Sequence, residues 1–181
     1  MDKQELVSLL KNHGVPVERF GTSTFKTIEH LVREIEAGES VLSEQDGRLL
    51  RSTSILYITV ECWIGDQSFR LREDRQIFTD GRLRRRPFLH GSVAEKLKAG
   101  ESPDQKAVIR ALQEELGIDR VRSAQQAGIT VLEEDSPSYP GLRARFTNHL
   151  WRVTLHPEDF QPEGYTEVQP DKTTYFVWDE I

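Results

Sequence analysis

The stretch SPDQKAVIRALQEELGI, residues 102–118, combines a helical pattern with acidic side chains beside its apolar stripe. At about 100° per residue, one apolar stripe must face the core. Its members are Val108, Ile109, Leu112 and Leu116. On the neighbouring arc, Glu114 and Glu115 flank Ala111. A carboxylate at the edge of a buried face needs a partner, because desolvating a charge is costly. A divalent cation meets that need, since Mg²⁺ favours carboxylate oxygens together with water and substrate phosphates.

An ordinary surface ion pair is the alternative interpretation of the same acids. Arg110 and Glu114 lie one helical turn apart, and such residues pair on the surface of many helices. Glu115 would then simply be exposed to solvent. Spacing alone leaves the metal site and the surface pair both open.

The ends of this helix carry clear signals. Ser102 is expected to be the N-cap, with Pro103 at the first helical position and Gln105 three residues after the cap. Gly117 is expected to end the helix, because glycine readily adopts the left-handed conformation found there. The sequence therefore predicts a helix from about 103 to 116.

The segment RALQEELGI, residues 110–118, resembles the second half of the Nudix box, the signature of hydrolases that cleave nucleoside diphosphates linked to another group. The family pattern is G-x5-E-x7-R-E-U-x-E-E-x-G-U, where U is a bulky apolar residue. Between Arg110 and Ile118 every specified position matches except Ala111, which stands where the family has a glutamate. The first glutamate of the pattern falls on Ser102, or on Glu101 if one residue has been inserted.

The resemblance implies a fold, an activity and a set of site residues. The expected fold class is α+β, a Nudix-like mixed β-sheet packed with the box helix. The expected activity is metal-dependent cleavage of the diphosphate in a nucleotide-like small molecule, with Mg²⁺ or Mn²⁺. Arg110, Glu114 and Glu115 are the expected catalytic residues, and Glu101, Glu114 and Glu115 the expected metal ligands. Glu95 is a further substitute for the missing acid, and the candidates for a general base are Glu133, Glu134 and Glu163.

A catalytically inactive Nudix-fold module is the alternative function. Ala111 favours it, because a divalent site without a central ligand loses transition-state stabilisation, and each ~1.4 kcal/mol is a factor of ten in rate. Such a module would bind a nucleotide or a protein partner. The N-terminal helices would then serve regulation or formation of a homodimer.

An arginine-rich segment precedes the box. Between residues 70 and 86 the sequence holds Arg70, Arg72, Arg75, Arg82, Arg84, Arg85 and Arg86. A solvated strand face would explain them. A phosphate cradle is the functional alternative, because planar guanidinium groups grip phosphate oxygens in pairs. Arg84 and Arg86 are the expected substrate-binding residues.

The remaining pattern supplies the elements that would hold this site. Two helices are expected in residues 1–45, the second capped by Thr24, and they form a helical appendage to a Nudix-like domain at 46–181. The run ILYITVECWI predicts a buried strand, and Asp80-Gly81 predicts a hairpin turn. After the central helix, three more strands are expected at 125–134, 143–155 and 173–180.

Composition limits the remaining alternatives. The net charge of −6 argues against broad affinity for nucleic acid, and no apolar run reaches the ~18 residues that span a bilayer. The lone Cys62 cannot form an intramolecular disulfide and is expected to be a buried apolar residue. His90 is expected to be structural rather than catalytic. With no recognisable signal peptide, a cytoplasmic location is the expectation.

Overall fold

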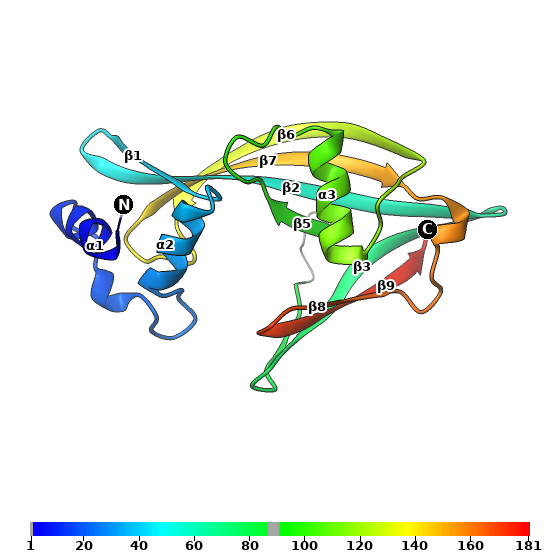
Figure 1. Ribbon diagram of the computed structural model, residues 1–181, viewed down its shortest axis with the longest axis horizontal. Coiled ribbons are helices and arrows are strands. Elements are labelled where there is room, and N and C mark those ends of the chain that lie inside the picture. Colours follow the sequence, from blue (N-terminus) through cyan, green and yellow to red (C-terminus); the bar gives the residue numbers. More distant parts are fainter. Residues whose placement is uncertain (1, 87–90) are drawn as a thin grey trace. The chain divides into compact units, whose positions relative to one another are not determined.

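The computed structural model describes residues 2–86 and 91–181 (Figure 1). Within them lie three α-helices, a large β-sheet and two short 3₁₀ turns at Val17–Arg19 and Pro157–Asp159. The helices are α1 (Lys3–Asn12), α2 (Ile28–Glu36) and α3 (Gln105–Leu116). The strands are β1 (Val41–Gln45), β2 (Arg48–Ile64), β3 (Gln67–Phe78), β4 (Leu83–Arg84), β5 (Val93–Lys96), β6 (Ser123–Asp135), β7 (Arg143–Thr154), β8 (Tyr165–Val168) and β9 (Lys172–Glu180). This arrangement confirms the α+β class.

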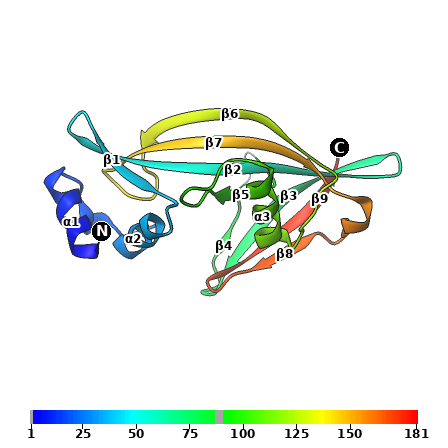
Figure 2. The same ribbon diagram turned by 45° about the horizontal axis from the view of Figure 1, so that its top comes forward.

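The strands follow the order β6-β7-β2-β3-β9-β8 (Figure 2). Strands β1 and β5 also pair with β2, and the short β4 pairs with β3. No helix in the described residues has the length and apolar character needed to cross a membrane.

The chain divides into two compact units, each discontinuous in sequence. The first contains Met1–Ile55, Lys96–Glu101 and Thr130–Asn148. The second contains Leu56–Glu95, Ser102–Ile129 and His149–Ile181. The expected domains, 1–45 and 46–181, stay a prediction.

The first unit is built on the two N-terminal helices. Leu6 and Leu10 of α1 are buried, and they share a core with Leu31 of α2. Helix α2 begins later than expected, because its N-cap is Thr27 and not Thr24. The backbone before it forms a turn, in which the N–H of Phe25 donates to the carbonyl of Thr22.

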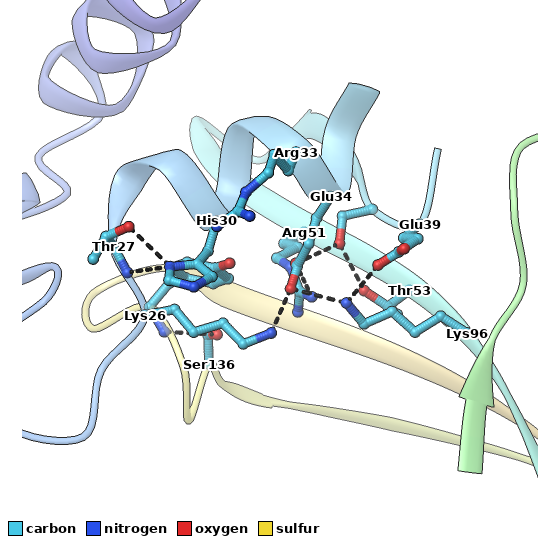
Figure 3. Close-up of polar contacts among 12 residues, drawn as sticks. Lys26, Thr27, His30, Arg33, Glu34, Glu39, Arg51, Thr53, Lys96 and Ser136 are labelled. Atoms are coloured by element: carbon cyan, nitrogen blue, oxygen red, sulfur yellow. Dashed lines mark hydrogen bonds and ion pairs between the residues drawn. The ribbon is translucent and has the colours of Figure 1, made fainter. Parts of the chain in front are cut away.

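A buried carboxylate lies at the centre of the first unit (Figure 3). Glu34 of α2 accepts from Lys26 Nζ at 2.6 Å and from Arg51 Nη2 at 2.7 Å, and it lies 2.8 Å from Lys96 Nζ. Ser40 Oγ donates to it at 3.1 Å. Burial alone would raise the pKa of Glu34, but these cations outweigh burial and hold it well below its usual range.

The second unit contains a fork between β2 and β3. The two strands pair from Glu61↔Arg70 to Ile64↔Gln67, and β3 continues along β9. At the fork, the N–H of Val60 donates to Ser92 Oγ at 2.9 Å, and Ser92 Oγ donates to the carbonyl of Leu71 at 2.5 Å. A single buried hydroxyl therefore satisfies a backbone donor on one strand and an acceptor on the other.

The expected hairpin and the expected end of the central helix are confirmed. Beyond Asp80-Gly81, Arg84 of β4 pairs with Gln76 of β3. Gly117 ends α3 with a φ of 71°. The expected start of the helix is wrong, because Asp104 and not Ser102 is the N-cap. The Asp104 carboxylate accepts the N–H groups of residues 106 and 107 at 2.9 and 3.1 Å, so the helix begins two residues after Pro103.

Candidate functional site

Helix α3 presents one apolar face and one charged edge, as its sequence predicts. Val108, Ala111 and Leu112 have no exposed surface. Glu114 is exposed and Glu115 is half-buried at the edge of that apolar face. The side chain at 111, where the Nudix pattern has an acid, is therefore part of the core.

Arg110 joins acids from two elements. Its Nη1 lies 2.5 Å from Glu114 Oε2 on the next turn of the helix, and 3.4 Å from Glu95 Oε1 on β5. The surface pair expected from spacing is present, and a second acid shares it. One guanidinium thus orients two carboxylates at the edge of α3.

Glu115 faces two other acids. Burial raises the pKa of its carboxyl to about 8, and the neighbouring Glu167 on β8 and Glu95 on β5 add to that shift. Lys172 opposes the shift but does not cancel it. Like charges on three elements thus act on one another near the C-terminal end of α3, an arrangement that favours either a shared proton or a cation.

Glu167 was not expected at this place. It lies on a four-residue strand, where it pairs in register with Thr174 of β9, and its sequence context carries no motif. Its neighbourhood with Glu115 comes from the packing of α3 beside β8. Only the tertiary structure identifies this acid.

The two expected substrate-binding arginines differ in their surroundings. Arg86 binds the buried Glu73 with both Nε, at 2.9 Å, and Nη2, and its charge also acts on Glu115. Arg84 on β4 is exposed, and no ion pair to it occurs in the described residues. Arg84 therefore keeps its donors available, whereas Arg86 is held next to the acids.

The other predicted site residues are not among the acids that raise the pKa of Glu115. Glu101 belongs to the first unit, where its carboxylate accepts from the N–H of Lys98 at 2.9 Å, so its role as a metal ligand stays a prediction. Glu133 and Glu134 also belong to the first unit, and Glu163 is exposed in the second. His90 lies outside the described residues.

The acidic group suits a hard cation in its chemistry. Its donors are all carboxylate oxygens, from Glu95, Glu115 and Glu167. No three acidic, histidine or cysteine side chains of residues 2–86 and 91–181 converge closely enough to hold a metal ion by themselves. Mg²⁺ does not require such a cage, because it commonly binds one or two carboxylates and takes its other ligands from water and substrate phosphates. A magnesium ion at these carboxylates would therefore need water and substrate oxygens as its further ligands.

Comparisons with known proteins give limited similarity. A C. elegans Ap4A hydrolase is 14% identical over 70% of this chain and 79% of its own, with a TM-score of 0.40. A binary complex of a C. elegans Ap4A hydrolase is 15% identical over the same shares of the two chains, with a TM-score of 0.40. The NUDIX domain of Shewanella oneidensis NrtR complexed with ADP ribose is 12% identical over 69% of this chain and 70% of its own, with a TM-score of 0.39. TM-scores this low carry no conclusion about this chain.

No protein-family model matches the sequence, and the search of curated proteins found no match. The Nudix resemblance therefore rests on residues 110–118 themselves.

Proposed function

We propose that the second unit hydrolyses the diphosphate of a nucleoside diphosphate-linked substrate with Mg²⁺ or Mn²⁺. One observation carries the proposal. Helix α3 keeps Arg110, Glu114 and Glu115 of the Nudix pattern, and two strands bring Glu95 and Glu167 beside them. An acidic group of this kind has little structural reason to form next to a core stripe, because its members repel one another.

Each side chain has a distinct role in this proposal. Glu115 and Glu167 would hold the cation through carboxylate oxygens. Arg110 keeps Glu114 and Glu95 oriented by its two ion pairs. The exposed Arg84 would grip a phosphate oxygen. When bound, the cation would neutralise charge on the diphosphate and lower the pKa of the attacking water.

Ligand binding without hydrolysis is the second candidate function, and Ala111 favours it. Position 111 is an alanine with no exposed surface, so it supplies no carboxylate to the site. Under this alternative, Arg110, Arg84 and Arg86 recognise phosphates, and the acids shape the rim of the site. Turnover of a substrate distinguishes hydrolysis from ligand binding alone.

Calorimetric titration of Mg²⁺ and Mn²⁺, with and without ADP-ribose, is the first test. The Glu114→Gln/Glu115→Gln double variant should lose the binding, and Glu158→Gln, which changes an exposed acid of the same unit, should keep it. Cation binding that is equal in wild type and double variant would overturn the proposed site.

Release of phosphate from a panel of nucleotides, with both cations, is the second test. Metal-dependent turnover that disappears in Glu115→Gln would establish the hydrolase. Cation-dependent ligand binding with no turnover across the panel would reject hydrolysis in favour of the binding module.

A further inference from the structure

A pocket of about 260 Å³ opens in the second unit beside the fork between β2 and β3. Its walls are Thr59, Arg70, Leu71, Arg72, Gly91, Ser92 and Arg152. Three of these side chains are guanidinium groups from two strands, β3 and β7, and none of the described lining residues is acidic. The proposed hydrolase site uses none of these arginines.

The β3 arginines of the pocket lie on the opposite face of the strand from Glu73. Along β3, Leu71 and Glu73 are buried, whereas Arg70 and Arg72 are exposed. Successive side chains of a strand point to opposite faces, so the two arginines face away from Glu73. Glu73 binds Arg86, whose charge acts on Glu115. The two sites are thus separate.

A buried carboxylate positions two of the three arginines. Glu61 Oε1 accepts from Arg70 Nε at 3.1 Å and from Arg70 Nη2 at 2.8 Å. The other oxygen, Oε2, lies 3.9 Å from Arg152 Nε. Only 9% of Glu61 is exposed, so its geometry is well fixed.

Acids on β3 and β9 position the third arginine. Arg72 Nε donates to Asp179 at 2.8 Å, and Nη1 donates to Asp74 at 3.1 Å. A guanidinium has five N–H donors, so these bonds leave at least one terminal nitrogen of Arg72 for a ligand. Arg70 likewise has Nη1 available for a ligand, because its bonds to Glu61 use Nε and Nη2. Arg152 has the longest ion pair of the three arginines, at 3.9 Å.

The net charge of the pocket favours the binding of an anion. The three arginines carry three positive charges, and Glu61 and Asp179 pair with them. The third acid, Asp74, also pairs with Arg75 at 2.5 Å, so that its charge is balanced outside the pocket. One positive charge is therefore left over at the pocket. Guanidinium groups held in fixed orientations match the oxygens of a phosphate group.

We propose that this three-arginine pocket binds the phosphate group of a small molecule, as a second anion site distinct from the acidic group on α3. Its volume suits one phosphate with a small attached group rather than a polymer. The net charge of −6 acts against a polyanion such as nucleic acid. The site would operate whether or not the acidic group hydrolyses a diphosphate.

Calorimetric titration with inorganic phosphate, at constant ionic strength set by NaCl, tests this inference. Wild type should bind phosphate with saturation, and Arg152→Gln should weaken the binding about tenfold, the effect of losing one charge-assisted hydrogen bond. Arg152→Gln should fold normally, because the side chain is 62% exposed and its one ion pair is long. Arg120→Gln, which removes an exposed arginine of the same unit, should bind like wild type.

Two further titrations test whether phosphate binds at this pocket and whether the pocket prefers phosphate to other anions. Glu114→Gln/Glu115→Gln should retain phosphate binding, because neither acid lines the pocket. Acetate, a planar carboxylate, should bind more weakly than phosphate. Absence of saturable phosphate binding, equal affinity in Arg152→Gln and wild type, or equal affinity for acetate would overturn the proposal.

Discussion

Glu34 Oε2 accepts a hydrogen bond of 2.7 Å from Arg51 Nη2, and both side chains are almost completely buried in the first unit. Arg51 also lies with its guanidinium carbon 5.3 Å from the ring centre of the buried Tyr139. Lys96 reaches the same carboxylate from another segment of the chain (Figure 3). One carboxylate thus links segments that are distant in sequence, so removing its charge should affect the whole unit.

Glu34→Gln should destabilise the protein by about 3 kcal/mol, because it leaves the buried Arg51 without its counter-ion. Urea unfolding at pH 7 measures the change. Asp135→Asn is the control, since Asp135 is 87% exposed and its pair with Arg143 is 3.5 Å long. Surface pairs contribute only about 0–1 kcal/mol. Equal losses in the two variants would show that Glu34 does not hold the unit together.

Acidification should remove the same contribution. The pKa of Glu34 is depressed in the folded chain and near its ordinary value of 4.5 in the unfolded chain. The stabilisation is therefore complete above about pH 4.5 and is lost progressively as the pH falls toward the folded value. Urea unfolding of wild type and Glu34→Gln at pH 7, 5 and 3 measures the difference in their free energies of unfolding. This difference should be smaller at pH 3 than at pH 7 and 5. A difference that stays constant would contradict the depressed pKa.

Gly164→Ala should cost more than about 3 kcal/mol, because the added Cβ would lie 1.9 Å from the carbonyl oxygen of Phe176. Gly65→Ala is the matched control. Both glycines have positive φ, 85° and 60°, but no atom lies within 4 Å of a Cβ at 65. The control should lose only the ~1 kcal/mol of backbone strain. Thermal unfolding of both variants separates the clash from the strain.

Ala111→Glu should destabilise the protein by about 3 kcal/mol rather than restore a metal ligand, because position 111 has no exposed surface. Gln113→Glu, at an exposed position of the same helix, should be nearly neutral. Thermal unfolding and Mn²⁺ titration of both variants give the comparison. An Ala111→Glu protein as stable as wild type, with tighter Mn²⁺ binding, would refute this assignment of position 111 to the core.

Much of the fold follows from local pattern. The run ILYITVECWI of β2 and the Asp80-Gly81 turn each predict their element, because strand propensity and turn chemistry act over a few residues. The strands β5 and β8 were not predicted, since four residues carry too little pattern. The start of α3 was misplaced, because Ser102 and Asp104 are both good caps and only the backbone decides between them.

The candidate site was predictable only where it lies on one helix. Arg110, Glu114 and Glu115 were expected from the resemblance of residues 110–118 to the Nudix pattern, because spacing alone left a surface pair equally open. Glu167 does not, because its place beside Glu115 depends on how β8 and β9 pair and on how the helix packs. The same reason applies to the pocket at the fork, where Arg152 joins arginines that lie about eighty residues earlier in the sequence.

The discontinuous first unit has a consequence for synthesis on the ribosome. Its helices α1 and α2 leave the exit tunnel early, but Lys96 and the segment Thr130–Asn148 follow much later. Until then Glu34 has no Lys96 beside it, and the apolar residues of α1 cannot contact Tyr139 and Leu142. During that interval the nascent chain exposes an amphipathic helix pair, which a chaperone at the exit tunnel could shield.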